Sequence, residues 1–318
     1  MAPLPLALPD DWLRRCWVLA GPTAAGKTAI GLQLAERIGA EILCLDSMTL
    51  YRGLDIGTAK PTLEERARVP HHLLDRLDPH EECSVADYLE MARDAVADVF
   101  SRGRIPLFVG GSGMYLRALL RGLCASPPGD EKLRAEIAAW ADAISPEALH
   151  AELRAADPAA AARLHPRDRR RILRALEVFR LTGRPLSALQ NEARRPPEAR
   201  PRVAVWLSAP RAAVYDRIDR RVAAMFAAGL EDEILRIGTA EERWSRTASQ
   251  AIGYRELLAV LRGEQPRAGL IERIQTHTRQ FAKRQWTWFR NLAECEEFPI
   301  SPDESPQQIA ERIAARGG

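Results

Sequence analysis

The chain of 318 residues is long for a single α/β domain and is better suited to two domains. Its hydrophobic fraction of 46% is ordinary for a soluble globular protein, no apolar run is long enough to span a bilayer, and no basic segment precedes an apolar stretch at the N-terminus. We therefore expect a cytoplasmic protein without a membrane segment or secretory signal. The five cysteines lack C-x-x-C spacing, which favours reduced thiols and argues against a zinc site.

Residues 12–122 alternate between predicted strands and predicted helices. The strands are expected at residues 16–20, 41–45 and 105–109, and the helices at residues 27–38, 85–101 and 113–121. Ser84 and Asp87 form a variant of the capping box at the start of the second helix. The alternation predicts a parallel sheet with helices on its faces.

The segment between the first strand and the first helix is a phosphate-binding loop. Residues 21–28 read Gly-Pro-Thr-Ala-Ala-Gly-Lys-Thr and match the pattern G-x-x-x-x-G-K-[ST]. Gly21 and Gly26 let backbone N–H groups turn toward phosphate oxygens, and the helix N-terminus adds partial positive charge. Lys27 supplies a full positive charge, and Thr28 can hold Mg²⁺. The loop leaves two classes open: a transferase or kinase acting on a small molecule, and a mechanical NTPase.

Two more turns follow predicted strands. Asp46 ends the strand at 41–45, and ligands of open α/β sheets bind beyond the carboxyl ends of the strands. Its carboxylate could coordinate Mg²⁺ or act as a general base, and the alternative is that it caps the following turn through the N–H of Ser47. Residues 110–113, Gly-Gly-Ser-Gly, open a helix after the third strand. This second turn either faces an anion or is only a turn.

The composition changes at Cys124, where the strand–helix alternation stops. Residues 130–195 read as helices rich in alanine and arginine, with N-cap and N1-proline signals at Ser145-Pro146 and Asp157-Pro158. Breaks rich in proline bound this stretch at residues 125–129 and 195–201. We predict a discontinuous core of residues 1–123 and 201–318 and an inserted helical domain of residues 124–200.

An arginine cluster lies in the predicted insert. The twelve residues from Arg163 to Arg174 contain six arginines and one acid, Asp168. We expect a buried stripe of Ile172, Leu176 and Phe179, and we expect Arg170, Arg171 and Arg174 to lie off it. The shortage of acids favours contact with a phosphate backbone. The alternative is a solvated face in which the arginines pair with Asp168 and Glu177.

The α/β pattern resumes with a strand predicted at residues 203–207. Further helices are predicted at residues 211–237, 248–262 and 268–291, and a last one begins with Ser305 as its N-cap. The helix at 268–291 contains a basic run with the interleaved aromatic residues Phe281, Trp286, Trp288 and Phe289, and Phe281, Gln285 and Trp288 recur at helical spacing. Such aromatic residues are more often part of a core than a base-stacking platform, whereas the basic face is a candidate for a nucleic-acid groove.

Taken from the residues alone, the chain is an α/β protein with a P-loop NTPase-like parallel sheet flanked by helices and an inserted all-helical domain. It is a phosphate-loop transferase with an acidic base, and the insert suggests a nucleic-acid acceptor. A small-molecule kinase and a nucleic-acid-stimulated NTPase remain the alternatives.

Several stretches resemble the bacterial tRNA dimethylallyltransferases, also called tRNA isopentenyltransferases. Residues 46–61, Asp-Ser-Met-Thr-Leu-Tyr-Arg-Gly-Leu-Asp-Ile-Gly-Thr-Ala-Lys-Pro, resemble the family block D-S-x-Q-x-Y-R-G-x-D-I-G-T-A-K-P. The other matching stretches are residues 21–28, 110–119, 171–178, 248–256 and 278–290. The resemblance runs from about residue 16 to residue 291.

The resemblance implies a reaction and its partners. A dimethylallyl group moves from dimethylallyl diphosphate to the N6 amine of adenosine 37, next to the anticodon, in tRNAs reading codons that begin with U. The phosphate loop then holds a diphosphate leaving group, with Mg²⁺ as cofactor, and the acceptor is the tRNA anticodon stem-loop. Lys27, Mg²⁺ and the loop amides would stabilise the charge on the leaving group. We expect a monomer.

The resemblance also assigns roles to residues. Asp46 would accept the N6 proton, and Thr23 and Arg221 would position the diphosphate. The implied diphosphate-binding residues are Gly21, Pro22, Thr23, Ala24, Ala25, Gly26, Lys27 and Thr28. The implied tRNA-contacting residues are Asp46, Ser47, Met48, Thr49, Ser112, Arg170, Arg171, Ile172, Leu173 and Arg174. Thr49 replaces the family's usual glutamine, which removes a bidentate amide contact to a base edge, and Ser112 replaces a threonine while keeping the hydroxyl.

Overall fold

The computed structural model describes residues 7–124, 130–192, 195 and 199–318. These residues fold as two compact units, one within residues 8–120 and 197–318 and the other within residues 1–7 and 121–196. The break predicted at residues 125–129 lies outside the described residues, as does part of the break at 195–201.

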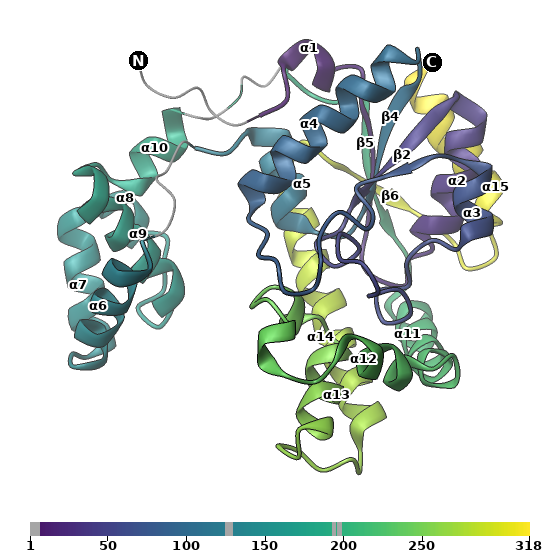
Figure 1. Cartoon of the computed structure of the whole chain (residues 1–318). Coiled ribbons are helices and arrows are strands. Elements are labelled where there is room, and N and C mark those ends of the chain that lie inside the picture. Colours follow the sequence, from purple (N-terminus) through teal and green to yellow (C-terminus); the bar gives the residue numbers. More distant parts are fainter. Residues whose placement is uncertain (1–6, 125–129, 193–194, 196–198) are drawn as a thin grey trace. The chain divides into compact units, whose positions relative to one another are not determined.

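The larger unit is built on one parallel sheet of six strands (Figure 1). The strands are β1 (Trp17–Ala20), β2 (Ala40–Leu45), β3 (His71–His72), β4 (Ile105–Gly110), β5 (Val203–Ser208) and β6 (Glu296–Pro299), in the spatial order β3-β2-β4-β1-β5-β6. β1 lies in the middle, where Trp17 is paired with Leu107 on one side and Val203 on the other. Every residue of β1 and β2 is buried, as expected for strands covered by helices on both faces. The predicted parallel α/β sheet is confirmed.

Helices cover both faces of this sheet. α2 and α15 pack against each other on one face, and α4 and α5 lie on the other (Figure 1). The helices of the unit are α1 (Asp10–Leu13), α2 (Lys27–Ile38), α3 (Leu63–Arg68), α4 (Val85–Ser101), α5 (Gly113–Arg121), α11 (Arg211–Ala227), α12 (Leu230–Ile237), α13 (Tyr254–Leu261), α14 (Leu270–Arg290) and α15 (Pro306–Ala314). Short 3₁₀ turns occupy Glu241–Arg243, Ala248–Gln250 and Ala315–Gly317.

The ends of several helices follow their predicted capping signals. Ser84 and Asp87 form a reciprocal capping box at the start of α4, and Ser305 with Gln308 forms another at the start of α15. The single helix predicted at 211–237 is instead two helices. Gly229, with a φ of 92°, interrupts the helical backbone between α11 and α12. Residues 248–262 likewise give a 3₁₀ turn and then α13, which starts after Gly253 at a φ of 96°.

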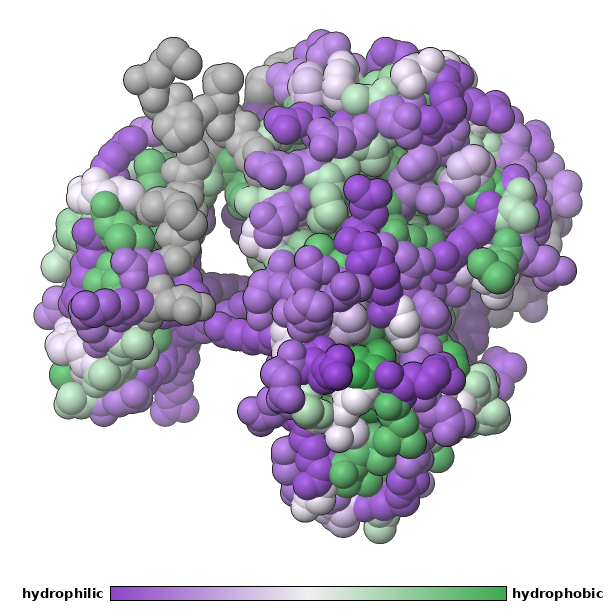
Figure 2. Space-filling model, in the orientation of Figure 1, coloured by the Kyte–Doolittle hydropathy of each residue, from purple (hydrophilic) through white to green (hydrophobic). Residues whose placement is uncertain are grey.

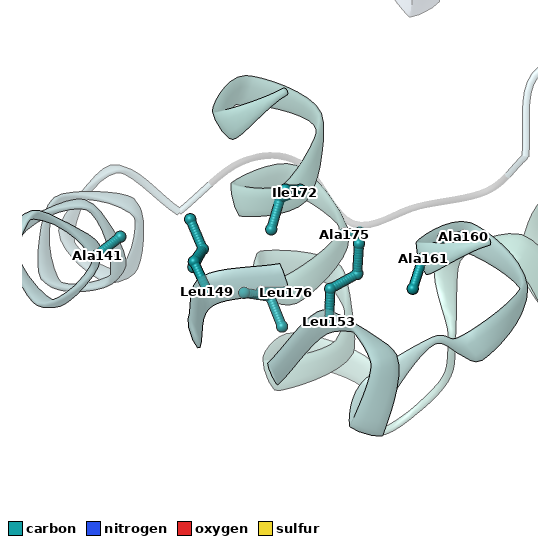
Figure 3. Packing of buried hydrophobic residues seen from close by; sticks show 8 residues of the cluster. All are labelled: Ala141, Leu149, Leu153, Ala160, Ala161, Ile172, Ala175 and Leu176. Atoms are coloured by element: carbon teal, nitrogen blue, oxygen red, sulfur yellow. The ribbon is translucent and has the colours of Figure 1, made fainter. Parts of the chain in front are cut away.

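The smaller unit contains five helices within its described residues. They are α6 (Glu131–Asp142), α7 (Pro146–Ala156), α8 (Pro158–Ala161), α9 (Arg169–Thr182) and α10 (Leu186–Glu192). Their core is formed by Ala141, Leu149, Leu153, Ala160, Ala161, Ile172, Ala175 and Leu176 (Figure 3). Phe179, expected in the buried stripe of α9, is only half-buried, and Ala175 and Val178 are buried instead.

A buried carboxylate joins two helices of the smaller unit. Asp157 is fully buried and accepts a hydrogen bond from the N–H of Ala160, which makes it the N-cap of α8 as predicted. The same carboxylate accepts hydrogen bonds from the N–H and the hydroxyl of Ser187 in α10. This short polar network fixes α10 against α8.

The surface of the larger unit is mainly hydrophilic on the face that Figure 2 shows, with hydrophobic side chains gathered over α12 and α13. Leu235 of α12 is 52% exposed. Among the described helices, none combines the length and the apolar character that crossing a bilayer requires.

Candidate active site

The phosphate loop of residues 21–28 joins the end of β1 to the start of α2. Gly26 is the N-cap of α2 and has a φ of 88°, a left-handed conformation that favours glycine. Five loop residues line one cavity of about 620 Å³, namely Thr23, Ala24, Gly26, Lys27 and Thr28. The other three predicted phosphate-binding residues, Gly21, Pro22 and Ala25, are buried behind them.

Lys27 is the cation of the loop. Its Nζ donates a hydrogen bond of 2.7 Å to the carbonyl oxygen of Pro22. Burial lowers the pKa of Lys27 to about 8, Asp46 opposes this shift, and the positive charge of Arg221 adds to it. The ammonium group is therefore a poorly solvated cation in the cavity, which a bound anion would stabilise.

Asp46 follows the last residue of β2 and also lines the cavity. Burial raises the pKa of its carboxyl group, whereas a hydrogen bond from the N–H of Met48 and the charges of Lys27 and Arg221 lower it. The Met48 N–H lies 2.8 Å from Oδ1 of Asp46. The suggested cap through Ser47 is therefore wrong, because the Ser47 N–H donates to Oγ of Ser112 at 3.1 Å instead. A carboxylate with a raised pKa inside a cavity is suited to accept a proton.

The glycine-rich turn after β4 adjoins the turn after β2, because these two strands are neighbours in the sheet. The N–H groups of Gly111 and Ser112 both donate to the carbonyl oxygen of Leu45 at 3.1 Å. With these bonds and the Ser47 bond, Ser112 helps to hold the backbone next to Asp46. Thr49, which is only 7% exposed, also lines the cavity and donates from its hydroxyl to the carbonyl oxygen of Asp46.

Arg221 reaches the cavity from α11, far along the chain. Its Nη2 donates to the carbonyl oxygen of Thr58 at 3.3 Å. Burial lowers the pKa of Arg221, and the carboxylate of Asp46 opposes this shift. Thr23, Asp46 and Arg221, the three residues expected to be catalytic, thus line the same cavity. The cavity also has an apolar part, which includes Ile42, Val109 and Phe281.

Gln285 of α14 is a site residue for which sequence reasoning had assigned no role. Its side-chain oxygen accepts a hydrogen bond of 2.8 Å from the N–H of Thr23, and its side-chain nitrogen donates one of 2.9 Å to the carbonyl oxygen of Gly111. It is 4% exposed. One amide therefore holds the phosphate loop against the glycine-rich turn, a role that requires a donor and an acceptor on one side chain.

A second buried anchor, Glu233 of α12, holds the loop from residue 55 to residue 57. Its carboxylate accepts hydrogen bonds from the N–H groups of Asp55, Ile56 and Gly57 and from the hydroxyl of Tyr254. Thr58, whose carbonyl oxygen binds Arg221, follows this loop directly. Local sequence offered no signal for this anchor, because the partners are 176 to 178 residues apart.

The arginine cluster lies in the smaller unit, within α9 and the segment before it. Arg170 and Arg171 are exposed, and Arg171 forms an ion pair of 3.2 Å with Asp168. Arg174 is bound to the buried carboxylate of Glu177 at 3.0 Å. Both pairs are those of the solvated-face alternative. The side chain of Ile172 is fully buried and Leu173 packs against the same core, and the tRNA contacts expected of these two residues stay predictions.

The fold and the cavity define a class of α/β protein in which a loop of the phosphate-binding pattern and a carboxylate line one cavity. The IPP transferase family model matches residues 49–292, and the isopentenyl transferase model matches residues 14–81. The chain belongs to the IPP transferase family.

Individual relatives agree with this assignment. The chain is 49% identical to the tRNA dimethylallyltransferase of Geobacter metallireducens, over 88% of this chain and 91% of that protein. It is 47% identical to that of Halorhodospira halophila, over 94% of this chain and 97% of the relative. Among solved structures, the full-length tRNA isopentenylpyrophosphate transferase of Bacillus halodurans has a TM-score of 0.69 at 38% identity and covers 95% of this chain and 96% of its own. A eukaryotic dimethylallyltransferase acting on tRNA has a TM-score of 0.74 at 28% identity, covering 90% of this chain and 73% of that one.

Proposed function

We propose that this protein transfers a dimethylallyl group from dimethylallyl diphosphate to N6 of adenosine 37 in tRNAs that read codons beginning with U, and releases diphosphate. The observation that carries the proposal is the single cavity in which the carboxylate of Asp46 meets the phosphate loop and Arg221. Prenyl transfer to tRNA is the activity named for the relatives.

Different residues of the cavity would have different roles in the proposed reaction. The allylic C–O bond breaks, and its electron pair leaves with the diphosphate, while N6 forms the new C–N bond. Lys27, Arg221 and loop N–H groups that are not bonded within the protein would stabilise the negative charge of the departing oxygen. The proton that N6 loses passes to the carboxylate of Asp46, whose pKa burial raises. Because these groups line a cavity, the adenine must leave the stack of the anticodon loop to reach them.

We also propose Mg²⁺ as the metal ion of the cavity. Thr28 and Asp46 both line the cavity, and Mg²⁺ typically takes one or two protein oxygen ligands besides water and substrate phosphates. Thr28 is the residue that would hold the ion, as in other phosphate loops. When bound, the ion would neutralise charge on the diphosphate oxygens.

One assay separates this proposal from its rivals. The protein is incubated with labelled dimethylallyl diphosphate and either bulk tRNA or AMP, and ATP hydrolysis is measured in parallel with and without tRNA. We expect label in tRNA only and no tRNA-stimulated ATP hydrolysis. Label in AMP would indicate an enzyme of free adenine nucleotides, and ATP hydrolysis without prenyl transfer would indicate an NTPase.

We also propose that the smaller unit binds tRNA phosphates, in a cytoplasmic monomer. Arg170 is exposed and forms no ion pair within the described residues, and Arg171 is exposed and paired only with Asp168. The double variant Arg170→Ala/Arg171→Ala should lower tRNA affinity and reduce the slope of log affinity against log salt by about 0.7–0.9 for each lost contact. Arg154→Ala, an exposed arginine on α7, is the matched control. An unaltered slope with unaltered affinity would reject this role, and size-exclusion chromatography tests the monomer.

A further inference from the structure

Arg217 is a half-buried cation with two buried donor atoms, and the roles above leave it without a function. It lies on α11 one turn before Arg221, and both side chains line the cavity. Residues four apart on a helix share a face, so the two guanidinium groups approach the cavity from the same side. Within the described part of the chain, Nε and Nη2 of Arg217 are shielded from solvent and have no hydrogen-bond partner.

Such an unpaired group is unusual. Buried polar side chains in native proteins nearly always have a partner, and leaving a charged donor unpaired costs free energy. Burial lowers the pKa of Arg217, and the positive charge of Arg220 adds to this effect, while Asp216 opposes it. A guanidinium group nevertheless stays charged at neutral pH. The cavity therefore contains a permanent positive charge, and two of its donors have no partner within the described residues.

The two neighbouring arginines are already bound within the protein. Arg220 forms an ion pair of 2.6 Å with Asp216, and Arg221 donates to the carbonyl oxygen of Thr58. No acid of the described residues forms an ion pair with Arg217. Of the three arginines of α11 that line the cavity, Arg217 is the one with two donors that are buried and have no partner within the described residues, whereas Arg221 keeps further donors for the departing oxygen.

The pattern of free donors indicates the chemistry of that ligand. Nε and Nη2 form one edge of the guanidinium plane, and two parallel N–H groups on such an edge match two oxygens of one phosphate group. The phosphate loop and Lys27 line the same cavity. We propose that Arg217 binds the terminal phosphate of the substrate diphosphate through its Nε–Nη2 edge. This inference rests on the proposed function, because it takes the diphosphate as the anion of the cavity.

The proposed contact differs in kind from that of a catalytic group. The terminal phosphate carries its charge before the allylic C–O bond breaks, so a contact there strengthens substrate binding and transition-state binding about equally. Removing it should raise KM for dimethylallyl diphosphate and leave kcat nearly unchanged. Losing a bidentate, charge-assisted contact should weaken binding by about 10- to 100-fold.

The test uses the full chain and two substitutions of the residue. Arg217→Met keeps the length of the side chain and removes the donors, whereas Arg217→Lys keeps the charge without the two-pronged edge. Arg236→Met, on the exposed surface of α12, removes one positive charge outside the cavity and is the control. The affinity for inorganic diphosphate is measured without RNA by thermal shift and calorimetry, and KM and kcat are measured for dimethylallyl diphosphate.

We expect Arg217→Met to fold with an unchanged or higher Tm in the absence of diphosphate, because it no longer contains two buried donors without a partner. Its affinity for inorganic diphosphate should fall by about 10- to 100-fold, Arg217→Lys should recover only part of the loss, and the control should match the wild type. Unchanged diphosphate affinity together with a flatter salt dependence of tRNA binding would assign Arg217 to an RNA phosphate instead. If neither measurement changes, Arg217 binds no phosphate.

The outcome is independent of the transfer assay. If the labelled dimethylallyl group is not transferred to tRNA while inorganic diphosphate still binds through Arg217, the proposed function fails and the phosphate contact stands. If transfer to tRNA occurs at an unchanged KM for dimethylallyl diphosphate in Arg217→Met, the proposed function stands and the phosphate contact is wrong.

Discussion

Replacing Lys27 by arginine should abolish the alkaline decline in the use of dimethylallyl diphosphate. Burial is the main reason why the pKa of Lys27 is lowered to about 8. A diphosphate binds the charged ammonium group, so affinity should fall as the pH rises through this pKa. Arginine stays protonated throughout the accessible pH range, so the variant should lack this decline whatever its absolute rate.

The magnitude follows from the fraction of protein in which Lys27 is charged. With a pKa of about 8, that fraction is about 90% at pH 7 and about 10% at pH 9, so kcat/KM for dimethylallyl diphosphate should fall about ninefold to tenfold between them. The terminal phosphate of the substrate contributes little to this fall, because its last proton is lost near pH 6. Asp46 determines the acidic side of the pH profile. Because burial raises the pKa of its carboxyl group, activity should increase with pH until this group is deprotonated and then level off.

The assay is a pH series of initial rates at saturating tRNA and low dimethylallyl diphosphate, for the wild type and Lys27→Arg. A wild-type profile that is flat to pH 9 would show that Lys27 is not a titrating group of the free enzyme. An alkaline limb near pH 8 that persists in Lys27→Arg would assign the titration to another residue. Either result would refute the reasoning from burial.

Three further predictions follow from the contacts of the site and of the helical core. Asp46→Asn should lower kcat by about 10²–10⁴-fold with little change in tRNA affinity, and a variant that keeps a third of the wild-type kcat would exclude Asp46 as the base. Gln285→Leu should leave the N–H of Thr23 and the carbonyl of Gly111 unpaired, which lowers unfolding free energy by about 2–6 kcal/mol in urea titrations and raises KM for dimethylallyl diphosphate. An unchanged KM would show that this amide does not position the phosphate loop. Ile172→Ala should lower the unfolding free energy by about 2–5 kcal/mol through loss of packing. If tRNA affinity falls while calorimetry shows that the smaller unit is fully folded, Ile172 does more than pack in the core.

The central strands and the helices next to the phosphate loop could be predicted because their signals are local. The apolar strands at the sheet centre and the capping boxes of α4 and α15 can each be recognised from a few residues that are close together in the sequence. β6 was missed because Glu296 and Glu297 give it no apolar run, and β3 was missed because it has only two residues. The place of β3 at the sheet edge depends on its pairing with β2 rather than on its own sequence.

The candidate site divides in the same way. The phosphate loop and Asp46 were found from spacing along the chain, since the motif and the strand end are contiguous. Gln285 had been noted only for its helical spacing, and Glu233 gave no signal, because their roles exist only once distant segments pack together. For the arginine cluster, composition predicted more than the fold provides. The shortage of acids favoured unpaired cations, whereas the structure pairs Arg171 and Arg174 with acids three residues away.

The bond between Thr23 and Gln285 has a consequence for how the protein is made. The two residues are 262 positions apart, so the phosphate loop leaves the ribosome long before Gln285, which holds it in place, is synthesised. At about 5–20 residues per second, this interval lasts roughly 13 to 50 s. The five helices of the smaller unit emerge within that interval and have a core of their own with which to fold. A nascent chain should therefore acquire its ability to hold a diphosphate late and abruptly, when α14 becomes available to dock.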